Sequence, residues 1–280
     1  MPMNHAPNSG SRIQRAQAYS RYAAVYDRIG QRIFGERIAE ATLAFLAEQN
    51  VYPNSVIDLA CGTGAATLVF AREGLAVTGV DLSNSMLEVA CQAGIEAGIY
   101  VTWRQQDMRQ LTVVEPVDLV TCFYDGINYL IEIDDLDVVF SRVWDALLPD
   151  GYFIFDLNTR EKFDASWNDS CQIATNREEI FGVYQSWYEA DTGLSPLILT
   201  FFVRQEDGSW DRFDEEHLER AFELELVKTR LIETGFTVNA MLDYSDRSPR
   251  FGKTGSESSH RVVFVVRKPS PEESLLESKR

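Results

Sequence analysis

Short apolar runs alternate with amphipathic segments along the first half of the chain. Runs with the length and composition of β-strands cover residues 55–59, 76–80, 101–105, 117–122 and 152–156. Apolar residues recur at helical spacing before and between these runs, at residues 12–50, 65–73, 84–93 and 134–147. Because strands that alternate with helices are joined by right-handed crossovers, the pattern predicts an α/β fold with a parallel sheet.

The pattern changes after the fifth strand. Residues 161–214 hold aromatic and β-branched residues in alternation, which predicts an antiparallel β meander. An insertion at this place lies near the carboxyl edge of the sheet, where ligands of such folds bind. We therefore expect a substrate lid, with a decorative insert or a dimer contact as the alternatives. The remaining predicted elements are a helix at residues 219–234 and strands at residues 236–243 and 261–268.

The first two strands each end in a carboxylate. Asp58 precedes a turn that contains Gly62 and Gly64, and Asp81 ends the second strand. Glycines let the backbone approach a ligand closely, since they lack a Cβ and tolerate positive φ. A carboxylate at the tip of the second strand can accept hydrogen bonds from a ribose diol. This βαβ unit therefore predicts a cofactor that contains a nucleoside.

The residues of the turn indicate which cofactor it binds. A nicotinamide-binding turn reads G-x-G-x-x-G and places a pyrophosphate at the helix N-terminus, but Thr67 stands at the third glycine position here. Asp58 would repel a pyrophosphate and attract a cation such as the ammonium of an amino-acid moiety. S-adenosylmethionine carries that ammonium, a sulfonium and a ribose without any phosphate. It is the predicted cofactor, and a nicotinamide dinucleotide is the alternative.

Three motifs make the chain resemble the class I S-adenosylmethionine-dependent methyltransferases. They are D-L-A-C-G-T-G at residues 58–64, V-T-G-V-D-L-S at 77–83 and Q-Q-D-M at 105–108. The resemblance covers residues 19–158 and 261–268, and it implies a Rossmann-like, seven-stranded, mostly parallel sheet whose last two strands form an antiparallel edge. Three further stretches resemble the small-molecule N-methyltransferases, which include glycine and deoxyaminosugar N-methyltransferase-like proteins. These stretches are Y-A-A-V-Y-D at 22–27, C-F-Y-D-G-I-N-Y-L at 122–130 and G-Y-F-I-F-D-L-N-T at 151–159.

The resemblance also implies which side chains meet the cofactor. Asp81 would bind the ribose hydroxyls and Asp107 the adenine amino group. Leu82 and Met108 would flank the adenine ring, while Met86 would touch adenine or belong to the core. The full predicted set is Tyr26, Asp58, Ala60, Gly62, Gly64, Asp81, Leu82, Met86, Asp107, Met108 and Phe123.

The predicted catalytic residues are Tyr22, Asp125, Tyr129 and His217. Tyr22 and Tyr26 share one helical face, and the resemblance implies that this helix covers the cofactor with a tyrosine near the sulfonium. A stripe at that spacing is also typical of ordinary packing. Asp125 and Tyr129 follow the fourth strand, where the transferred methyl group would lie. Asp125, Glu216, His217 or water could take a proton from an amine, although His217 could instead be a surface residue at a helix start.

The charge and cysteine content of the chain limit the binding partners that we expect for the protein. The chain has 26 basic and 43 acidic residues and a formal net charge of −17, so it gains nothing from neutralising nucleic-acid phosphates and is repelled by anionic membranes. The four cysteines contain no C-x-x-C pair, which predicts neither a zinc site nor a disulfide framework and favours a reduced, cytoplasmic setting. No H-x-x-x-H or carboxylate cluster predicts a metal. We expect a small-molecule acceptor, no nucleic-acid or membrane partner, and a monomer or homodimer.

Together these features predict transfer of a methyl group from S-adenosylmethionine to a small-molecule amine by in-line displacement, with proximity and alignment as the main contributions. Two alternatives stay open: an O- or C-methyltransferase of a small metabolite, and a regulator that binds the cofactor without catalysis. In the predicted layout, residues 19–160 and 215–268 form the methyltransferase domain and residues 161–214 form the lid. Residues 1–18 and 269–280 are expected to be disordered.

Overall fold

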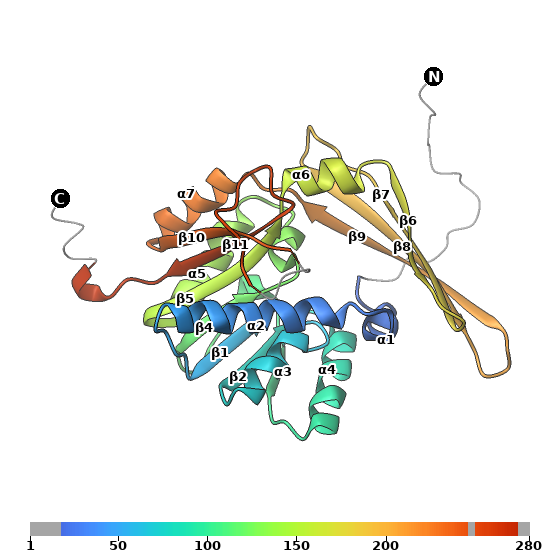
Figure 1. Cartoon of the computed structure of the whole chain (residues 1–280), viewed down its shortest axis with the longest axis horizontal. Coiled ribbons are helices and arrows are strands. Elements are labelled where there is room, and N and C mark those ends of the chain that lie inside the picture. The colour runs from blue at the N-terminus through green and yellow to red at the C-terminus, as the bar shows by residue number, and fades with distance from the viewer. Residues whose placement is uncertain (1–17, 246–249, 274–280) are drawn as a thin grey trace.

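The computed structural model describes residues 18–245 and 250–273. Its main element is a seven-stranded sheet in the order β10-β11-β5-β4-β1-β2-β3 (Figure 1), and every pair of neighbours is parallel except the two pairs that β11 makes. The sequence prediction of an α/β fold with a seven-stranded, mostly parallel sheet is confirmed. The strands of this sheet are β1 (Ser55–Leu59), β2 (Ala76–Asp81), β3 (Thr102–Gln105), β4 (Val117–Cys122), β5 (Leu147–Asn158), β10 (Thr237–Asp243) and β11 (Arg261–Arg267).

Helices cover both faces of this sheet. On one face, α2 (Arg32–Glu48) and α3 (Ala65–Arg72) bury residues such as Ile38 and Phe70 against the sheet, and α4 (Asn84–Ala97) follows them. On the other face, α5 (Asp135–Ala146) and α7 (Leu224–Thr234) bury Phe140 and Leu231. Alternate residues of β4 and β5 enter the two cores, which is why these strands read as nearly continuous apolar runs.

Parallel pairing brings the acidic strand ends together. Asp58 of β1 pairs with Gly79 of β2 and with Thr121 of β4, while Asp81 of β2 pairs with Gln105 of β3. The turns that follow these strands therefore lie side by side at the carboxyl edge of the sheet, the edge at which open α/β folds bind ligands. Short 3₁₀ turns, η2 (Met108–Gln110) and η3 (Gly126–Tyr129), follow β3 and β4 at this edge.

A second, antiparallel sheet projects from the central sheet (Figure 1). It consists of β6 (Ser170–Asn176), β7 (Ile180–Ser186), β8 (Leu194–Arg204) and β9 (Trp210–Arg220) in sequential order. The short helix α6 (Arg160–Lys162) and the π-helical turn η4 (Phe163–Trp167) connect it to β5. One face buries Leu199, Phe201 and Phe213 against Tyr22 and Val25 of the N-terminal segment. The predicted antiparallel meander is thus present, and the N-terminal segment packs on it.

Two predicted helices differ in the structure. The segment predicted as helical from residue 12 is α1 (Ala23–Tyr26), η1 (Asp27–Ile29) and α2, because Gly30 adopts a left-handed φ of 98° and breaks the helix; residues 12–17 lie outside the described residues. The helix predicted at 219–234 begins only at Leu224, since Glu219 and Arg220 pair with β8 as the end of β9. The second sheet therefore continues beyond the predicted lid boundary at residue 214.

The chain ends differ in part from the predicted layout. Residues 1–17 and 274–280 lie outside the described residues, so most of the predicted disordered lead and tail is not addressed. Ala18 belongs to the N-terminal segment that was expected to be disordered, and it lines a cavity described below. Residues 271–273 belong to the C-terminal segment that was expected to be disordered, and they are helical. Among the described residues, no helix combines the length and the apolar character needed to cross a membrane. The same residues hold no group of histidine, cysteine or carboxylate side chains suited to a metal ion.

Candidate functional site

A first cavity, of about 240 Å³, lies at the carboxyl edge of the central sheet. It is formed by the turns after β1, β2, β3 and β4 and by the N-terminal segment. Ten of the eleven residues predicted to contact the cofactor line it: Tyr26, Asp58, Ala60, Gly62, Asp81, Leu82, Met86, Asp107, Met108 and Phe123. The structure thus brings together residues from five separate parts of the sequence in one cavity.

Gly64 is the predicted residue that the cavity lining does not include. A Cβ at this position would lie 2.6 Å from Cη2 of Trp103, and the residue has a φ of 76°. Both observations favour glycine. The glycine therefore serves helix–sheet packing and the turn, and the prediction of direct ligand approach at Gly64 is not supported by its position.

Asp81 is oriented by two backbone donors. The N–H of Gly62 donates to one carboxylate oxygen at 2.8 Å, and the N–H of Ser83 donates to the other at 2.8 Å. Burial raises the pKa of Asp81, while these two hydrogen bonds favour the charged form. Each oxygen keeps a further lone pair, so the group can accept two vicinal hydroxyls. Its orientation suits a ribose diol in the cavity.

Asp58 lies deeper in the same cavity and is fully buried. The hydroxyls of Thr67 and Thr121 donate to its two oxygens at 2.5 and 2.8 Å. Burial raises the pKa of Asp58 to about 6, and the two hydroxyls counteract only part of this effect. No cationic side chain is paired with it among the described residues. A buried carboxylate of this kind suits an ammonium group and would repel a phosphate.

The remaining positions of this cavity fit a nucleobase. Asp107 accepts hydrogen bonds from the guanidinium of Arg109, which lower the pKa of Asp107, and its carboxylate lies at the cavity surface. Leu82 lines the cavity with 56% of its surface exposed, and Met108 faces the same cavity. These features fit a purine ring between apolar side chains with an acceptor at its edge. The chemistry of the lining thus matches the ammonium, ribose and adenine of S-adenosylmethionine.

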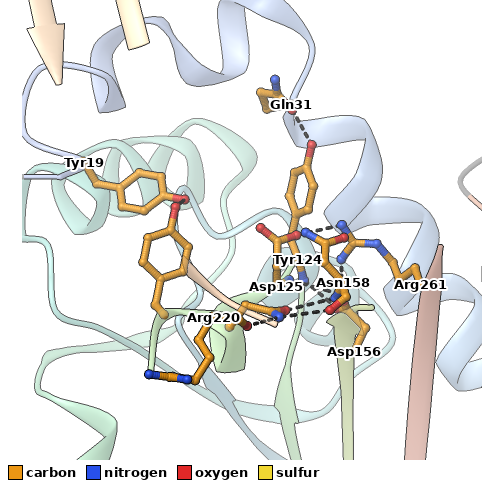
Figure 2. Close-up of polar contacts among 10 residues, drawn as sticks. Tyr19, Gln31, Tyr124, Asp125, Asp156, Asn158, Arg220 and Arg261 are labelled. Carbon is orange, nitrogen blue, oxygen red and sulfur yellow. Dashed lines mark hydrogen bonds and ion pairs between the residues drawn. The ribbon is translucent and has the colours of Figure 1, made fainter. Parts of the chain in front are cut away.

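A second cavity, of about 780 Å³, lies beside the first and extends to the second sheet. Five residues line both cavities: Tyr19, Tyr26, Gln31, Tyr124 and Tyr129. Four of them form two hydrogen-bonded pairs, and Figure 2 shows the pair of Tyr124 and Gln31. Tyr19 and Tyr129 are joined through their hydroxyls at 2.8 Å, and the hydroxyl of Tyr124 donates to the side-chain oxygen of Gln31. We call these five residues the shared wall, because they line both cavities.

A hydrogen-bond chain connects the shared wall to β9. The hydroxyl of Tyr129 is 2.9 Å from Nδ1 of His217, and Nε2 of His217 is 3.3 Å from Glu215. Glu215 also accepts the backbone N–H groups of Tyr19, Arg21 and Tyr22 at 2.5–2.8 Å. The predicted catalytic residues Tyr129 and His217 are therefore in contact, and both ring nitrogens of His217 have partners.

Tyr22, also predicted as catalytic, lines the second cavity only. Its ring stacks on Phe201 with ring centroids 5.3 Å apart, and its hydroxyl is hydrogen-bonded to that of Tyr184. Burial raises the pKa of both Tyr22 and Tyr129 well above the usual value. Neutral hydroxyls of this kind can orient an acceptor but are poor proton acceptors.

Asp125 and Arg261 line the second cavity and form an ion cluster with Asp156 (Figure 2). Arg261 donates to Asp125 at 2.7 Å and also to Asp156. Asp156 in turn accepts the backbone N–H groups of Tyr124 and Asp125 at 2.6 and 3.1 Å. These bonds hold Tyr124 and Asp125 at left-handed φ values of 60° and 59°, which are unfavourable for residues with a side chain.

Four functional candidates in this region are not predicted from the sequence, namely Asp156, Glu215, Glu219 and Arg261. Asp156 follows the rule that identified Asp58 and Asp81, since it lies near the carboxyl end of a parallel strand. Glu215 and Glu219 lie in a segment with helical composition that forms β9 instead. Arg261 shows no local pattern, because its partners lie more than a hundred residues earlier in the sequence.

Comparisons with known proteins identify methyltransferases as the relatives of this chain. A family described as "Methyltransferase domain" matches residues 56–151. The chain is 38% identical over 215 residues to a Geobacillus sp. (strain WCH70) protein named as a methyltransferase, covering 76% of this chain and 84% of the relative. It is 31% identical over 252 residues to YqeM of Bacillus subtilis (strain 168), also named as a methyltransferase, covering 89% of this chain and 97% of the relative. Neither name specifies an acceptor.

Two further similarities come from a more distant relative and from a solved structure. A dTDP-4-amino-2,3,4,6-tetradeoxy-D-glucose N,N-dimethyltransferase of Saccharopolyspora spinosa is 31% identical over 137 residues, which cover 48% of this chain and 53% of the relative. The crystal structure of an S-adenosylmethionine-dependent methyltransferase from Clostridium acetobutylicum ATCC 824 superimposes with a TM-score of 0.76 at 28% identity. That similarity covers 90% of this chain and 99% of the other.

Proposed function

Because this chain belongs to the S-adenosylmethionine-dependent methyltransferases, we propose that it transfers the methyl group to an amine nitrogen of a small molecule. S-adenosylmethionine supplies a methyl group bonded to a sulfonium, whose sulfur is a good leaving group. Asp58 would bind its ammonium, Asp81 its ribose and Asp107 its adenine. The chemistry then requires little beyond alignment of the acceptor with the methyl group and exclusion of competing water.

The second cavity is the observation that carries this proposal. It meets the first cavity at the shared wall, and its volume of about 780 Å³ lies within the range typical of small-molecule sites. The N-terminal segment and the second sheet contribute to its lining alongside the edge of the central sheet. This arrangement supports an acceptor of metabolite size, since the cavity is bounded by three parts of the chain.

The lining of the second cavity favours a cationic acceptor. Its carboxylates are Asp125, Glu219 and Asp243, and seven tyrosines contribute aromatic faces and hydroxyls. Arg261 and Lys162 also line it, and the charge of Arg261 is paired with Asp125 and Asp156. Aromatic faces and carboxylates both attract ammonium groups. The name of the Saccharopolyspora relative, which specifies an amino sugar, supports the same acceptor class.

A matched acceptor panel tests the proposal. Purified protein is incubated with S-adenosylmethionine and with pairs of compounds that differ only in an amine or a hydroxyl at one position, including nucleotide-linked sugars, free sugars and amino acids. We expect formation of S-adenosylhomocysteine and a mass gain of one methylene for at least one amine, and no reaction of its hydroxyl analogue. An Asp81→Asn variant serves as the control for turnover that depends on the cofactor site. Turnover of hydroxyl compounds or of proteins alone would contradict the proposal.

A further inference from the structure

Strand β9 presents three ionisable side chains toward the interior. Glu215, His217 and Glu219 alternate along the strand and are 0%, 2% and 1% exposed, whereas Glu216 between them is exposed. Alternate residues of a strand face the same side, so the three side chains form one row. His217 and Glu219 both line the second cavity.

Glu219 differs from the other acidic groups in this region in its partners. Glu215 is occupied by backbone N–H groups and His217, and Asp125 and Asp156 share the guanidinium of Arg261. Oε2 of Glu219 has no hydrogen-bond partner among the described residues, although it is buried. An unpartnered buried carboxylate oxygen is costly. The side chain of Asn158 lies beside this carboxylate and lowers its pKa, and the amide atoms of Asn158 also have no partner within hydrogen-bond distance among the described residues. Both side chains line the second cavity, so an acceptor bound there can pair with Oε2 of Glu219.

The backbone around Glu219 is held firmly in place. The side-chain nitrogen of Asn128 donates to the backbone oxygens of Asn158 and Arg220 at 3.0 and 2.8 Å (Figure 2). The backbone N–H of Asn158 donates back to the side-chain oxygen of Asn128 at 2.9 Å. The guanidinium of Arg220 donates to the backbone oxygens of Ile131 and Thr192. These bonds join the end of β9 to the end of β5, so Glu219 has a fixed position at the carboxyl edge of the central sheet.

We propose that Glu219 is the catalytic base that takes a proton from the acceptor ammonium before methyl transfer. In this step an N–H bond of the ammonium breaks, an O–H bond forms at Oε2 of Glu219, and the electron pair stays on nitrogen. The neutral amine then has the lone pair that the displacement requires, and the proton on Glu219 later passes to water. The inference rests on the proposed function, because an acceptor without an ionisable N–H has no need of this base.

The surroundings of Glu219 suit this role. Burial raises the pKa of Glu219 well above the usual value, and the charge of Asp125 raises it further, while Arg261 counteracts both. A carboxylate with a raised pKa is a stronger base than an exposed one, and it can still be ionised near neutral pH when a cation binds beside it. The ionisable groups that face it are Asp125 and Tyr129 after β4, Asp156 on β5, Arg261 on β11, Tyr19 of the N-terminal segment and His217 on β9 itself.

The test compares Glu219→Gln with Glu206→Gln, an exposed position in the turn between β8 and β9. The acceptor is the amine that the wild type methylates in the panel above, and kcat is measured from pH 6 to pH 9 with saturating acceptor. We expect Glu219→Gln to lower kcat by about 10²–10³-fold and to abolish the rise of kcat with pH that ionisation of Glu219 causes. Glu206→Gln should retain the wild-type profile. Calorimetric titration of S-adenosylhomocysteine into each variant checks the fold, and its affinity should stay within about threefold of wild type.

A second measurement does not depend on turnover. Protein labelled with ¹³C at the glutamate side-chain carboxyl is titrated by NMR, and the signal of Glu219 is identified by its loss in Glu219→Gln. We expect this signal to titrate at a higher pH than those of exposed glutamates and to shift when the amine binds. Wild-type turnover of an amine together with unchanged kcat and pH profile in Glu219→Gln would overturn this inference alone. Failure of the wild type to methylate any amine would overturn the proposed function as well.

Discussion

Replacement of Asp58 by asparagine should make the protein without cofactor more stable and should weaken cofactor binding. The carboxylate is fully buried with two threonine hydroxyls as its hydrogen-bond donors and no paired cation among the described residues. Asparagine has nearly the same shape and removes only the charge. Thr67 and Thr121 can rotate their hydroxyls to suit the amide, so both hydrogen bonds can persist in the variant.

The size of the effect follows from the pKa of Asp58, which burial raises from the usual 3.8 to about 6. This difference corresponds to about 3 kcal/mol of destabilisation of the charged form. This value already includes the hydrogen bonds from Thr67 and Thr121. Rotation of one hydroxyl so that it accepts from the amide of asparagine offsets about 1 kcal/mol of the gain. We therefore expect Asp58→Asn to raise the free energy of unfolding by about 2 kcal/mol at pH 8, and Tm by about 5 °C.

The pH dependence gives the effect its signature. Since the pKa of Asp58 is higher in the folded state than in the unfolded state, the folded wild type binds a proton more tightly between about pH 4 and pH 6. The stability that protonation provides is lost as the pH rises through this window. The difference between Asp58→Asn and wild type should thus be small near pH 4, grow up to about pH 6 and stay constant above pH 7.

The assay is urea unfolding at pH 4.5 and pH 8, followed by calorimetric titration of S-adenosylmethionine at pH 8. Glu115→Gln removes a charge from an exposed loop and controls for the change in net charge. Affinity for S-adenosylmethionine should fall at least about tenfold in Asp58→Asn, because the buried ammonium would lose its counter-ion. A free energy of unfolding that changes equally at both pH values, a variant less stable than wild type at pH 8, or an unchanged cofactor affinity would refute this account of Asp58.

Two further substitutions test the packing of the site. Gly79→Ala places a Cβ 2.5 Å from Cζ3 of Trp103, so it should lower the free energy of unfolding by urea by about 1–3 kcal/mol. In a Trp103→Leu background most of this loss should disappear. Strictly additive losses in the double variant would contradict the clash. Asn128→Ala removes two buried hydrogen bonds and one that is partly buried, so it should cost about 2–4 kcal/mol in the free energy of unfolding. The exposed Asn84→Ala should cost less than about 0.5 kcal/mol, and similar costs for both variants would show that the hydrogen bonds of Asn128 between β5 and β9 contribute little.

The cofactor cavity could be predicted closely from the sequence because its determinants are local. Gly62 and Asp81 belong to one βαβ unit of fixed geometry, and the hydrogen bond between them at 2.8 Å follows from that unit. Gly64 shows the limit of such reasoning. The motif identifies the glycine, but the reason for it lies in Trp103 of β3, which the motif does not contain.

The second cavity could be predicted only in part because its determinants are distant in sequence. Residues 215–220 have the composition of a helix start, yet they pair with β8 over the full length of β9, and tertiary pairing overrides local propensity. A helix would expose the acidic residues of this segment. In a strand, alternate residues face the interior, and Glu215 and Glu219 are therefore buried. The replacement of the expected helix by a strand is therefore the reason that Glu219 lines the second cavity.

Strand β9 also explains how the two cavities keep a common geometry. Through Glu215 it holds the backbone of the N-terminal segment, and Tyr19 of that segment lines both cavities. Through Asn128 its other end is fixed to β5 of the central sheet. Displacement in methyl transfer requires the acceptor atom, the methyl carbon and the sulfur in line, and small errors of placement are costly. Strand β9 is hydrogen-bonded both to the N-terminal segment, which lines the two cavities, and to the end of β5. A shift of β9 therefore moves the linings of both cavities together, and their relative position is preserved.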